Sequence, residues 1–197
     1  MNKKQIIFVT SNAGKVKSAQ RDLKDVEIIQ YKAELIEPRN DNIKEISKIK
    51  AIQAYKIVRK PCISMDSGFF IEELKGFPRS YVNYALETIG IEGILKLMEG
   101  KENRHCKFKE CLVYYDGHNM KFFEAETNGL LSNEIRGLEN EKNWSKLSYI
   151  FEVAEIGKTI AELDDNEREK YLSKKEQSCF KKFINWYFKN ENTINLK

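Results

Sequence analysis

Hydrophobic and polar positions along the chain follow two periods, and together they predict a mixed α/β fold. Residues 5–10 form a short run of β-branched and aromatic residues without polar alternation, which is typical of a strand covered on both faces. Residues 26–31 are a second candidate strand. Between residues 43 and 58, apolar residues recur close to helical spacing with Lys and Glu between them, which predicts an amphipathic helix.

The rest of the chain continues this alternation of strands and helices. The pattern predicts a strand at 62–65 that turns at Asp66-Ser67-Gly68, two helical pieces within 81–98, a hairpin of 107–115 and 121–127, a strand within 148–153, and a helix over 166–188. No internal repeat or linker interrupts the sequence. We therefore expect residues 1–197 to form one mixed α/β domain with two lobes around a central cleft.

The composition is that of an ordinary packed protein. With 41% hydrophobic residues, 10 Gly and 3 Pro, the chain is too apolar for disorder and too poor in Gly and Pro for a fibrous repeat. No apolar run approaches the roughly 20 residues that cross a bilayer, so we expect neither a membrane span nor secretion. The net charge of +4 is small against 34 basic and 30 acidic residues, so a nucleic-acid partner is not required.

Cysteine and histidine usage narrows the chemistry. Four cysteines in a chain of this length lack the density of a disulfide framework, and we read them as reduced thiols of a cytoplasmic protein. His105, Cys106 and Cys111 could bind a soft metal, but no CxxC pair accompanies them, which favours buried thiols over a zinc site. A catalytic triad built on either of the two histidines does not fit, because no nucleophile motif lies beside them.

A polar turn follows the first predicted strand. Ser11-Asn12-Ala13-Gly14-Lys15 places hydrogen-bonding side chains, a flexible Gly and a cation at the start of a helix over residues 15–24. Backbone N–H groups at a helix start favour anions and Lys15 adds a full positive charge, so the turn could hold a phosphate. The spacing is not that of a Walker loop. A capped helix start without a ligand is the alternative.

Carboxylates offer the second half of a phosphate site. Asp66 follows a predicted strand, at the edge where open α/β sheets commonly build their sites. Mg²⁺ prefers carboxylate and phosphate oxygens, so Asp66 could bind the metal or activate water, with a turn-capping role as the alternative. Glu37 is a further carboxylate in an acidic loop, whereas Glu45 and Lys48 read as an exposed helical pair. Metal-assisted attack of water on phosphorus fits these side chains.

Taken in order, these segments resemble the inosine triphosphate pyrophosphatase family, which hydrolyses non-standard purine nucleoside triphosphates to monophosphate and pyrophosphate. The opening strand and turn are similar to the family's (T/S)-(G/S)-N-x-x-K pattern. Further similar segments are Glu45-Ile46-Ser47 through Lys50-Ala51, Met65-Asp66-Ser67-Gly68 through Gly76-Phe77-Pro78, Thr127-Asn128-Gly129, and Gly157-Lys158-Thr159-Ile160-Ala161-Glu162-Leu163. The resemblance spans roughly residues 5 to 188.

The resemblance implies an elongated mixed β-sheet with flanking helices, two lobes around a central cleft, and a homodimer. It also implies roles for single residues. Glu37 and Asp66 would bind Mg²⁺, and Asp66 would orient or deprotonate the attacking water. Lys15 and Lys50 would act beside it on the phosphates. The substrate-binding residues on the phosphate side would be Ser11, Asn12, Lys15, Ser67 and Gly68.

The base-recognition half departs from the family pattern. Residues 143–151 replace F-G-(Y/W)-D-P-x-F without its Asp-Pro, and Ser173-Lys174-Lys175 replaces S-H-R. Trp144 and Tyr149 could still stack on a base, with core packing as the alternative, and Lys174 or Lys175 could donate to a carbonyl oxygen. Because specificity for an oxo group depends on matched hydrogen-bond donors, we expect the base preference to shift.

Two departures lie nearer the chemistry, and they keep alternatives open. Met65 replaces one of two acids before Ser-Gly, and Arg79 replaces the last glycine of G-x-P-G. We predict a Mg²⁺-dependent pyrophosphatase acting on ITP, dITP or XTP. The alternatives are a catalytically weakened nucleotide-binding relative, or a pyrophosphatase that prefers pyrimidine or modified bases. Single-stranded nucleic-acid binding by the basic last helix ranks last, because its aromatic residues recur at core spacing.

Overall fold

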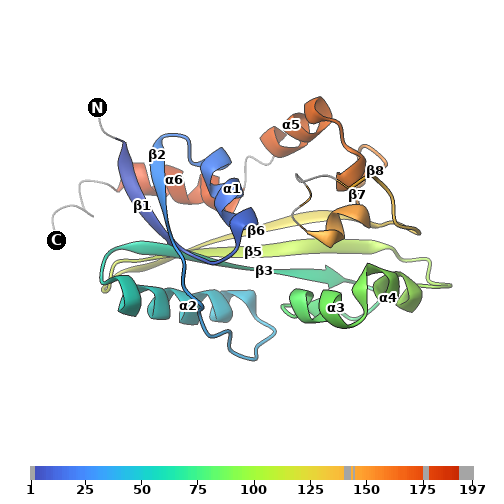
Figure 1. The fold of residues 1–197 in the computed structure, drawn as a ribbon, viewed down its shortest axis with the longest axis horizontal. Coiled ribbons are helices and arrows are strands. Elements are labelled where there is room, and N and C mark those ends of the chain that lie inside the picture. Colours follow the sequence, from blue (N-terminus) through green and yellow to red (C-terminus); the bar gives the residue numbers. More distant parts are fainter. Residues whose placement is uncertain (1–2, 140–142, 144, 175–177, 191–197) are drawn as a thin grey trace. The chain divides into compact units, whose positions relative to one another are not determined.

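The computed structural model describes residues 3–139, 143, 145–174 and 178–190. Within them, eight strands form a sheet in the order β2-β1-β3-β5-β6-β7-β8, with β4 paired to β3 (Figure 1). The strands are β1 (Lys4–Val9), β2 (Val26–Tyr31), β3 (Cys62–Ile71), β4 (Pro78–Arg79), β5 (His105–Tyr115), β6 (Met120–Leu131), β7 (Phe151–Val153) and β8 (Lys158–Thr159). The helices are α1 (Ala13–Asp22), α2 (Ile43–Val58), α3 (Val82–Thr88), α4 (Gly90–Leu97), α5 (Asp165–Lys174) and α6 (Cys179–Lys189), with 3₁₀ turns η1 (Lys146–Tyr149) and η2 (Ile160–Glu162).

The sheet contains both strand directions. β1 pairs in parallel with β2 and with β3, whereas β4 pairs antiparallel with β3. β7 pairs antiparallel with β6 and with β8. The mixed α/β class predicted from the sequence is therefore confirmed. In the described part of the chain, no helix is both long and apolar enough to span a membrane.

The chain forms two compact units. The first contains the described parts of Met1–Asp66, Glu110–Ala125 and Glu176–Lys197, and the second those of Ser67–Lys109 and Glu126–Lys175. Strands β3, β5 and β6 each contribute residues to both units. The central cleft between two lobes stays a prediction.

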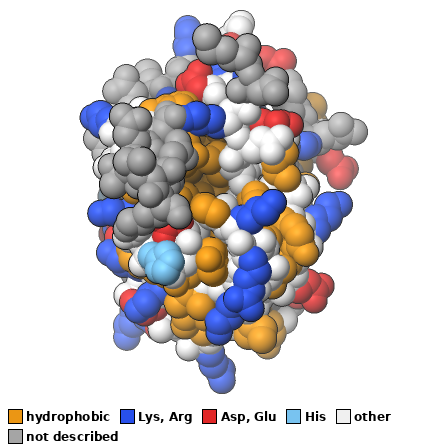
Figure 2. Space-filling view, turned by 90° about the vertical axis from the view of Figure 1, so that its left-hand side faces the viewer, with side chains coloured by type: hydrophobic (Ala, Val, Ile, Leu, Met, Phe, Trp, Pro, Cys, Tyr) orange, Lys and Arg blue, Asp and Glu red, His pale blue; other side chains and the backbone are white. Residues whose placement is uncertain are grey.

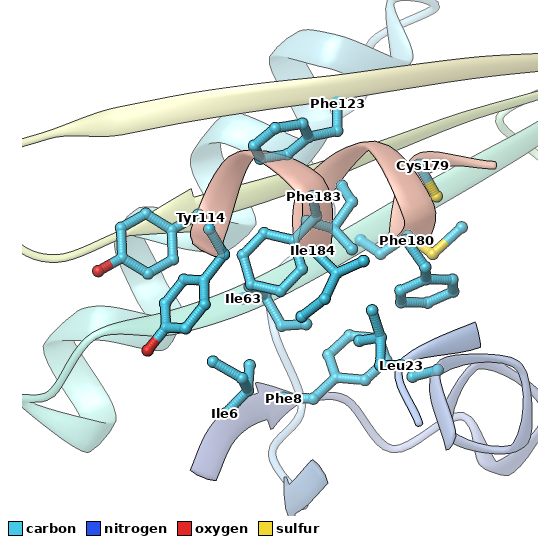
Figure 3. Close-up of a cluster of buried hydrophobic side chains, with 14 of the residues drawn as sticks. Ile6, Phe8, Leu23, Ile63, Tyr114, Phe123, Cys179, Phe180, Phe183 and Ile184 are labelled. Carbon is cyan, nitrogen blue, oxygen red and sulfur yellow. The ribbon is translucent and has the colours of Figure 1, made fainter. Parts of the chain in front are cut away.

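Alternation along β1 gives the first unit two different packed faces. Ile6 and Phe8 belong to a core cluster with side chains of α1 and α6, whereas Ile7 and Val9 pack with residues of α2. Figure 3 shows the first of these clusters, in which Phe183 and its neighbours on α6 lie over the strands. Because each face of β1 is covered, its sequence has the continuous apolar run that predicted a buried strand.

The predicted turn at Asp66-Ser67-Gly68 is wrong, because β3 continues through these residues to Ile71. Its beginning pairs with β1 and its end with β4, so backbone hydrogen bonds outweigh the weak strand preference of a single glycine. Asp66 therefore lies in the middle of a strand, neither at the end of one nor in a turn.

The helix predicted over residues 166–188 is two helices, α5 and α6. Ser178 begins α6 as its N-cap, and its side chain accepts a hydrogen bond from the Lys181 N–H at 3.2 Å. The strand predicted within 148–153 is shorter, because η1 occupies its beginning and only β7 follows. The sequence predicts a core-facing stripe of Tyr171, Cys179, Phe180, Phe183, Ile184 and Tyr187. The last five are buried on α6, which confirms that part of the stripe, whereas Tyr171 is partly buried and lies on α5.

The second unit has its own core. Phe69 at the end of β3 packs in one cluster with Ile94 of α4, Leu147 of η1 and Phe151 of β7. The break predicted around Gly90 and Gly93 in the helical segment 81–98 is confirmed at Gly90, whose φ of 67° lies in the left-handed region that glycine adopts without strain, whereas Gly93 lies within α4. The core of this unit therefore includes side chains of residues 147–151.

Candidate active site

Three charged side chains of the first unit gather around Asp66, two by direct contact and one through Lys50. The Lys50 Nζ donates hydrogen bonds to Asp66 Oδ1 at 3.0 Å and to Glu37 Oε1 at 2.6 Å. The Lys15 Nζ lies 3.5 Å from the same Asp66 oxygen and donates to the Met65 carbonyl at 3.0 Å. The structure thus brings together the residues for which catalytic and metal-binding roles are predicted.

The period of the strand explains why Asp66 faces α2. Ile63 and Met65 point into the core cluster shared with α1 and α6, so Ser64 and Asp66 project from the opposite face of β3. There the Ser64 hydroxyl donates to the Ser47 carbonyl of α2 at 3.5 Å. Asp66 is only 5% exposed, so its charge depends on the partners that the surrounding elements supply.

Lys50 reaches this carboxylate from the buried face of α2. The buried residues of that helix recur at helical spacing and are Ile43, Ile46, Ser47, Lys50, Ala51 and Ala54. A lysine in such a stripe is costly unless a counter-charge lies nearby. The position of Lys50 within the apolar stripe of this helix is visible in the sequence. The sequence analysis nevertheless assigns Lys50 to the site only through the family resemblance.

Hydrogen bonds to main-chain atoms fix the turn between β1 and α1. Asn12 is the N-cap of α1, and its Oδ1 accepts from the Lys15 N–H at 3.0 Å. The Asn12 N–H donates to Thr10 Oγ1 at 3.1 Å, and Gln30 Nε2 donates to the Thr10 carbonyl at 3.0 Å. The capped helix start is therefore present, and the cap holds the turn that carries Lys15. Thr10 and Gln30 were not predicted, because contacts with backbone atoms leave no periodic signal.

Burial and neighbouring charges shift the pKa values of Lys15 and Lys50 in opposite directions. The pKa of Lys15 is lowered, mainly because burial disfavours its charged form, and the nearby Asp66 charge offsets this only in part. Burial also acts to lower the pKa of Lys50, but the attraction of Asp66 and the contact with Glu37 outweigh it, so this pKa is raised. Lys50 is held as a cation, whereas Lys15 gains most from an arriving anion.

The remaining predicted phosphate-side residues are divided between the two units. Ser11 is exposed in the β1–α1 turn, next to Asn12. Ser67 and Gly68 follow Asp66 in β3 but belong to the second unit. Their substrate-binding roles stay predictions.

The predicted base-side residues are described only in part. Trp144 and Lys175 lie outside the described residues, and Lys174 is the last residue of α5. Tyr149 is partly buried and packs against the core of the second unit, which agrees with the packing alternative for this aromatic.

Polar residues around this segment make contacts within the second unit. Arg168 donates to Asn143 Oδ1 at 2.6 Å. Arg136 forms ion pairs with Glu152 and with Glu162, the latter at 3.6 Å. These contacts connect Asn143 with α5, and β7 with η2.

The cysteines have the properties of the buried thiols predicted from the sequence. All four are free and buried. Burial raises the pKa of Cys106 to about 12 and that of Cys111 to about 11, so both thiols keep their protons at neutral pH. Among the residues with described positions, no three His, Cys, Asp or Glu side chains gather as a metal-binding group.

Basic side chains on the surface lie among other residue types. On the face drawn in Figure 2, the described Lys and Arg side chains are interspersed with hydrophobic ones, and acidic side chains lie nearby. Several lysines are paired, for example Lys44 with Glu124, and Lys107 with Glu126. Such exposed pairs contribute little to stability but reduce the local positive potential.

Comparison with known proteins places this chain in a family. A model of the Ham1 family matches residues 6–186. The chain belongs to the Ham1 family. A dITP/XTP pyrophosphatase from Thermococcus kodakarensis is 34% identical over 188 residues, which cover 94% of this chain and 98% of that protein. A dITP/XTP pyrophosphatase from Pyrococcus horikoshii is 43% identical over 136 residues, covering 68% of this chain and 73% of that protein.

Solved Ham1 structures share the fold. The Ham1 protein of Staphylococcus aureus gives a TM-score of 0.69 at 22% identity, covering 85% of this chain and 90% of its own. That of Coxiella burnetii gives 0.71 at 22% identity, covering 87% and 95%. The resemblance predicted from the sequence motifs is therefore confirmed at the level of family and fold, whereas the roles of single residues stay predictions.

Proposed function

We propose that this Ham1 protein hydrolyses non-standard purine nucleoside triphosphates, such as dITP, XTP and ITP, to the nucleoside monophosphate and pyrophosphate. The observation that carries the proposal is the cluster in which Lys15 and Lys50 contact the buried Asp66, and Lys50 also contacts Glu37. Two cations beside two carboxylates suit a reaction in which negative charge shifts along a phosphate chain while water attacks phosphorus. The names of the relatives from Thermococcus and Pyrococcus support the same substrate class.

The donor set of this cluster fits Mg²⁺. Asp66 Oδ1 and Glu37 Oε1 both lie within hydrogen-bond distance of the single Lys50 Nζ, so the two carboxylates lie close together. Mg²⁺ is commonly held by one or two carboxylates together with substrate phosphates, so Asp66 and Glu37 would hold it here. When bound, the ion supplies positive charge that neutralises the phosphate oxygens.

The chain's own residues divide the remaining tasks. Asp66 would orient the attacking water and accept its proton, because it is a buried carboxylate held in a rigid strand. Lys50 holds that carboxylate in place through their 3.0 Å contact. Lys15 extends from the first turn of α1, where N–H groups and its own charge both favour a phosphate. Asn12 holds that turn in shape.

The direct test is a panel of triphosphates incubated with the purified protein and Mg²⁺. The panel contains dITP, XTP and ITP, the four standard triphosphates, and pyrimidine and modified-base analogues, and products are resolved as monophosphate, diphosphate, phosphate and pyrophosphate. We expect monophosphate and pyrophosphate in equal amounts, fastest from the 6-oxopurines. Release of phosphate and diphosphate instead would contradict attack at the α-phosphorus.

The same panel separates the alternatives. Preferred turnover of pyrimidine or modified bases would support a shifted specificity, for which the lost Asp-Pro and S-H-R motifs are the reason. Binding of a triphosphate in calorimetry without turnover of any would identify a nucleotide-binding relative. The absence of both turnover and binding would overturn the proposal altogether.

We further infer that the protein acts in the cytoplasm as a homodimer. Four free, buried cysteines support a reducing compartment. The dimer follows only from the family resemblance. Light scattering on the purified protein measures its mass directly, and a mass of about 23.1 kDa at working concentration would show a monomer instead.

A further inference from the structure

We propose that Gln53 is a positioning residue that sets the Glu37 carboxylate in the candidate active site. Gln53 Oε1 accepts a hydrogen bond from the Ile36 N–H at 2.9 Å, and Gln53 Nε2 donates to the Ile36 carbonyl at 2.8 Å. One side-chain amide thus binds both backbone groups of the residue immediately before Glu37. The inference rests on the proposed function, because that is where Glu37 receives its role.

Glu37 needs such a device because it lies in a segment without regular structure. Residues 32–42 connect β2 with α2 and belong to neither a helix nor a strand. Ala33 and Leu35 pack on the small core that includes Ala54, but the Ile36 side chain is 78% exposed and provides no apolar anchor. At residue 36, the hydrogen bonds of Gln53 therefore hold the loop in place of apolar packing.

Helical spacing connects this contact with the chemistry. Gln53 lies three residues after Lys50 on α2, so both side chains project from neighbouring positions on one face of the helix. Gln53 binds residue 36 while Lys50 binds residue 37, at 2.6 Å from Nζ to Oε1. The two contacts hold adjacent residues of the loop against a single rigid element. A carboxylate that is 56% exposed is thereby kept beside one that is buried.

The chemistry of the contact explains why glutamine is suited to it. A carboxamide offers one donor and one acceptor at a fixed separation, which matches the N–H and C=O of one backbone residue. Methionine has a similar length and helix propensity but forms neither bond, so Gln53→Met removes the contact with little change in volume. Gln20, an exposed glutamine of α1, provides the matched control Gln20→Met.

The first measurement needs neither metal nor substrate. Amide hydrogen exchange at Ile36, followed by NMR in the presence of EDTA, should be about tenfold faster in Gln53→Met than in the wild type, because the acceptor of that N–H is lost. Gln53→Ala, which removes the same bonds with a shorter side chain, is measured in parallel and should behave alike. Exchange at Ile36 that is unchanged in both variants would overturn the proposal.

The second measurement asks whether the contact matters for the cation. In Gln53→Met, we expect the Mg²⁺ concentration for half-maximal turnover to rise about three- to tenfold, while kcat at saturating Mg²⁺ stays within about twofold. Titration of Mn²⁺ by electron paramagnetic resonance, without substrate, should show the same loss of affinity. Gln20→Met should leave both unchanged. A purely structural role would lower the thermal stability and leave both cation titrations as in the wild type.

Glu37→Gln tests whether both residues act through one carboxylate. Adding Gln53→Met to Glu37→Gln should change the cation requirement by less than about twofold further, because the positioned ligand is already gone. Fully additive effects would overturn the proposal. If the wild type turns over no triphosphate, the proposed function fails, whereas Ile36 exchange and the Mn²⁺ titrations still decide the role of Gln53.

Discussion

The two units differ in how they use their charged residues. In the first unit, Lys50 and Lys15 are directed at buried Asp66, and the Lys50 contact extends to a carboxylate open to solvent. In the second unit, Arg136 is directed at Glu152 and Glu162, and these contacts connect segments of that unit to one another. The charges of the first unit are thus concentrated around one buried carboxylate, whereas the described charges of the second unit connect separate segments of the chain.

The largest expected effect comes from removing the charge at the centre of the first unit. Asp66→Asn should lower kcat/KM by roughly 1000-fold, because an amide cannot accept the proton of the attacking water and binds Mg²⁺ weakly. Steady-state kinetics on the preferred triphosphate measures this, with circular dichroism to show that the fold is retained. Activity within about tenfold of the wild type would remove Asp66 from the chemistry.

Replacing either lysine separates stability from activity. Lys50→Met should lower the free energy of unfolding by about 3 kcal/mol, because it takes the closest counter-charge from a buried carboxylate. Lys15→Met should leave the free energy of unfolding unchanged or higher, because burial already disfavours the Lys15 charge. It should nevertheless reduce kcat/KM at least as much as Lys50→Met does. Chemical denaturation measures both variants. Equal destabilisation would show that the two lysines have the same role.

The second unit should respond in the opposite way. Arg136→Met should lower the free energy of unfolding by about 1–3 kcal/mol, because its two partners are partly buried, while kcat changes little. Lys96→Met provides the control, since the Lys96–Glu99 pair is exposed and should contribute less than about 0.5 kcal/mol. A large loss of kcat in Arg136→Met would mean that the base side takes part in the chemistry.

A pH profile sharpens the contrast between the two lysines. The pKa of Lys15 is lowered from the ordinary 10.5, so its charge is lost at a lower pH than that of a free lysine. We therefore expect kcat/KM to fall as the pH rises through this lowered pKa. The pKa of Lys50 is raised, so the stability it contributes persists to a higher pH and is lost only above the ordinary range. Lys15→Arg should move the alkaline limb of activity upward, since guanidinium keeps its charge. Coincident limbs would exclude Lys15 as the titrating group.

The smallest expected effect lies at the end of α2, outside the chemistry. Arg59 follows the helix with a φ of 53°, where a side chain costs energy that glycine avoids. Arg59→Gly should raise the free energy of unfolding by about 0.5 kcal/mol, after the greater flexibility of the unfolded chain is subtracted. Thermal melting measures this change. No change in kcat/KM is expected, and a decrease would connect the helix end to the site.

Much of the first unit could be predicted because its elements are strongly periodic. The bounds of α2 follow from its apolar stripe, and β1 from a run buried on both faces. β3 was cut short at Gly68, because pairing with β4 is a long-range contact that a local pattern does not contain. The predicted final helix was too long, because the core stripe of α6 does not indicate where a helix begins.

Residues of the candidate site could be predicted where they belong to a sequence motif. Residues that form hydrogen bonds with backbone groups could not be predicted. Asn12, Lys15 and Asp66 stand in recognisable patterns, and the structure gathers the last two with Lys50. Gln53 and Thr10 hold neighbouring main-chain groups, so their importance depends on which loop packs beside them. Such contacts are set by the tertiary fold and leave no spacing in the sequence.

The Lys50 ammonium group, which contacts both Asp66 and Glu37, also affects the protein before any nucleotide binds. An internal counter-ion, built from the chain itself, relieves the repulsion that two neighbouring acids would otherwise impose on a newly made molecule. We therefore expect the chain to fold without a divalent ion. If turnover depends on Mg²⁺ as proposed, a chelator should stop turnover while the melting temperature stays the same. The protein would then stay folded in a cell that is short of magnesium.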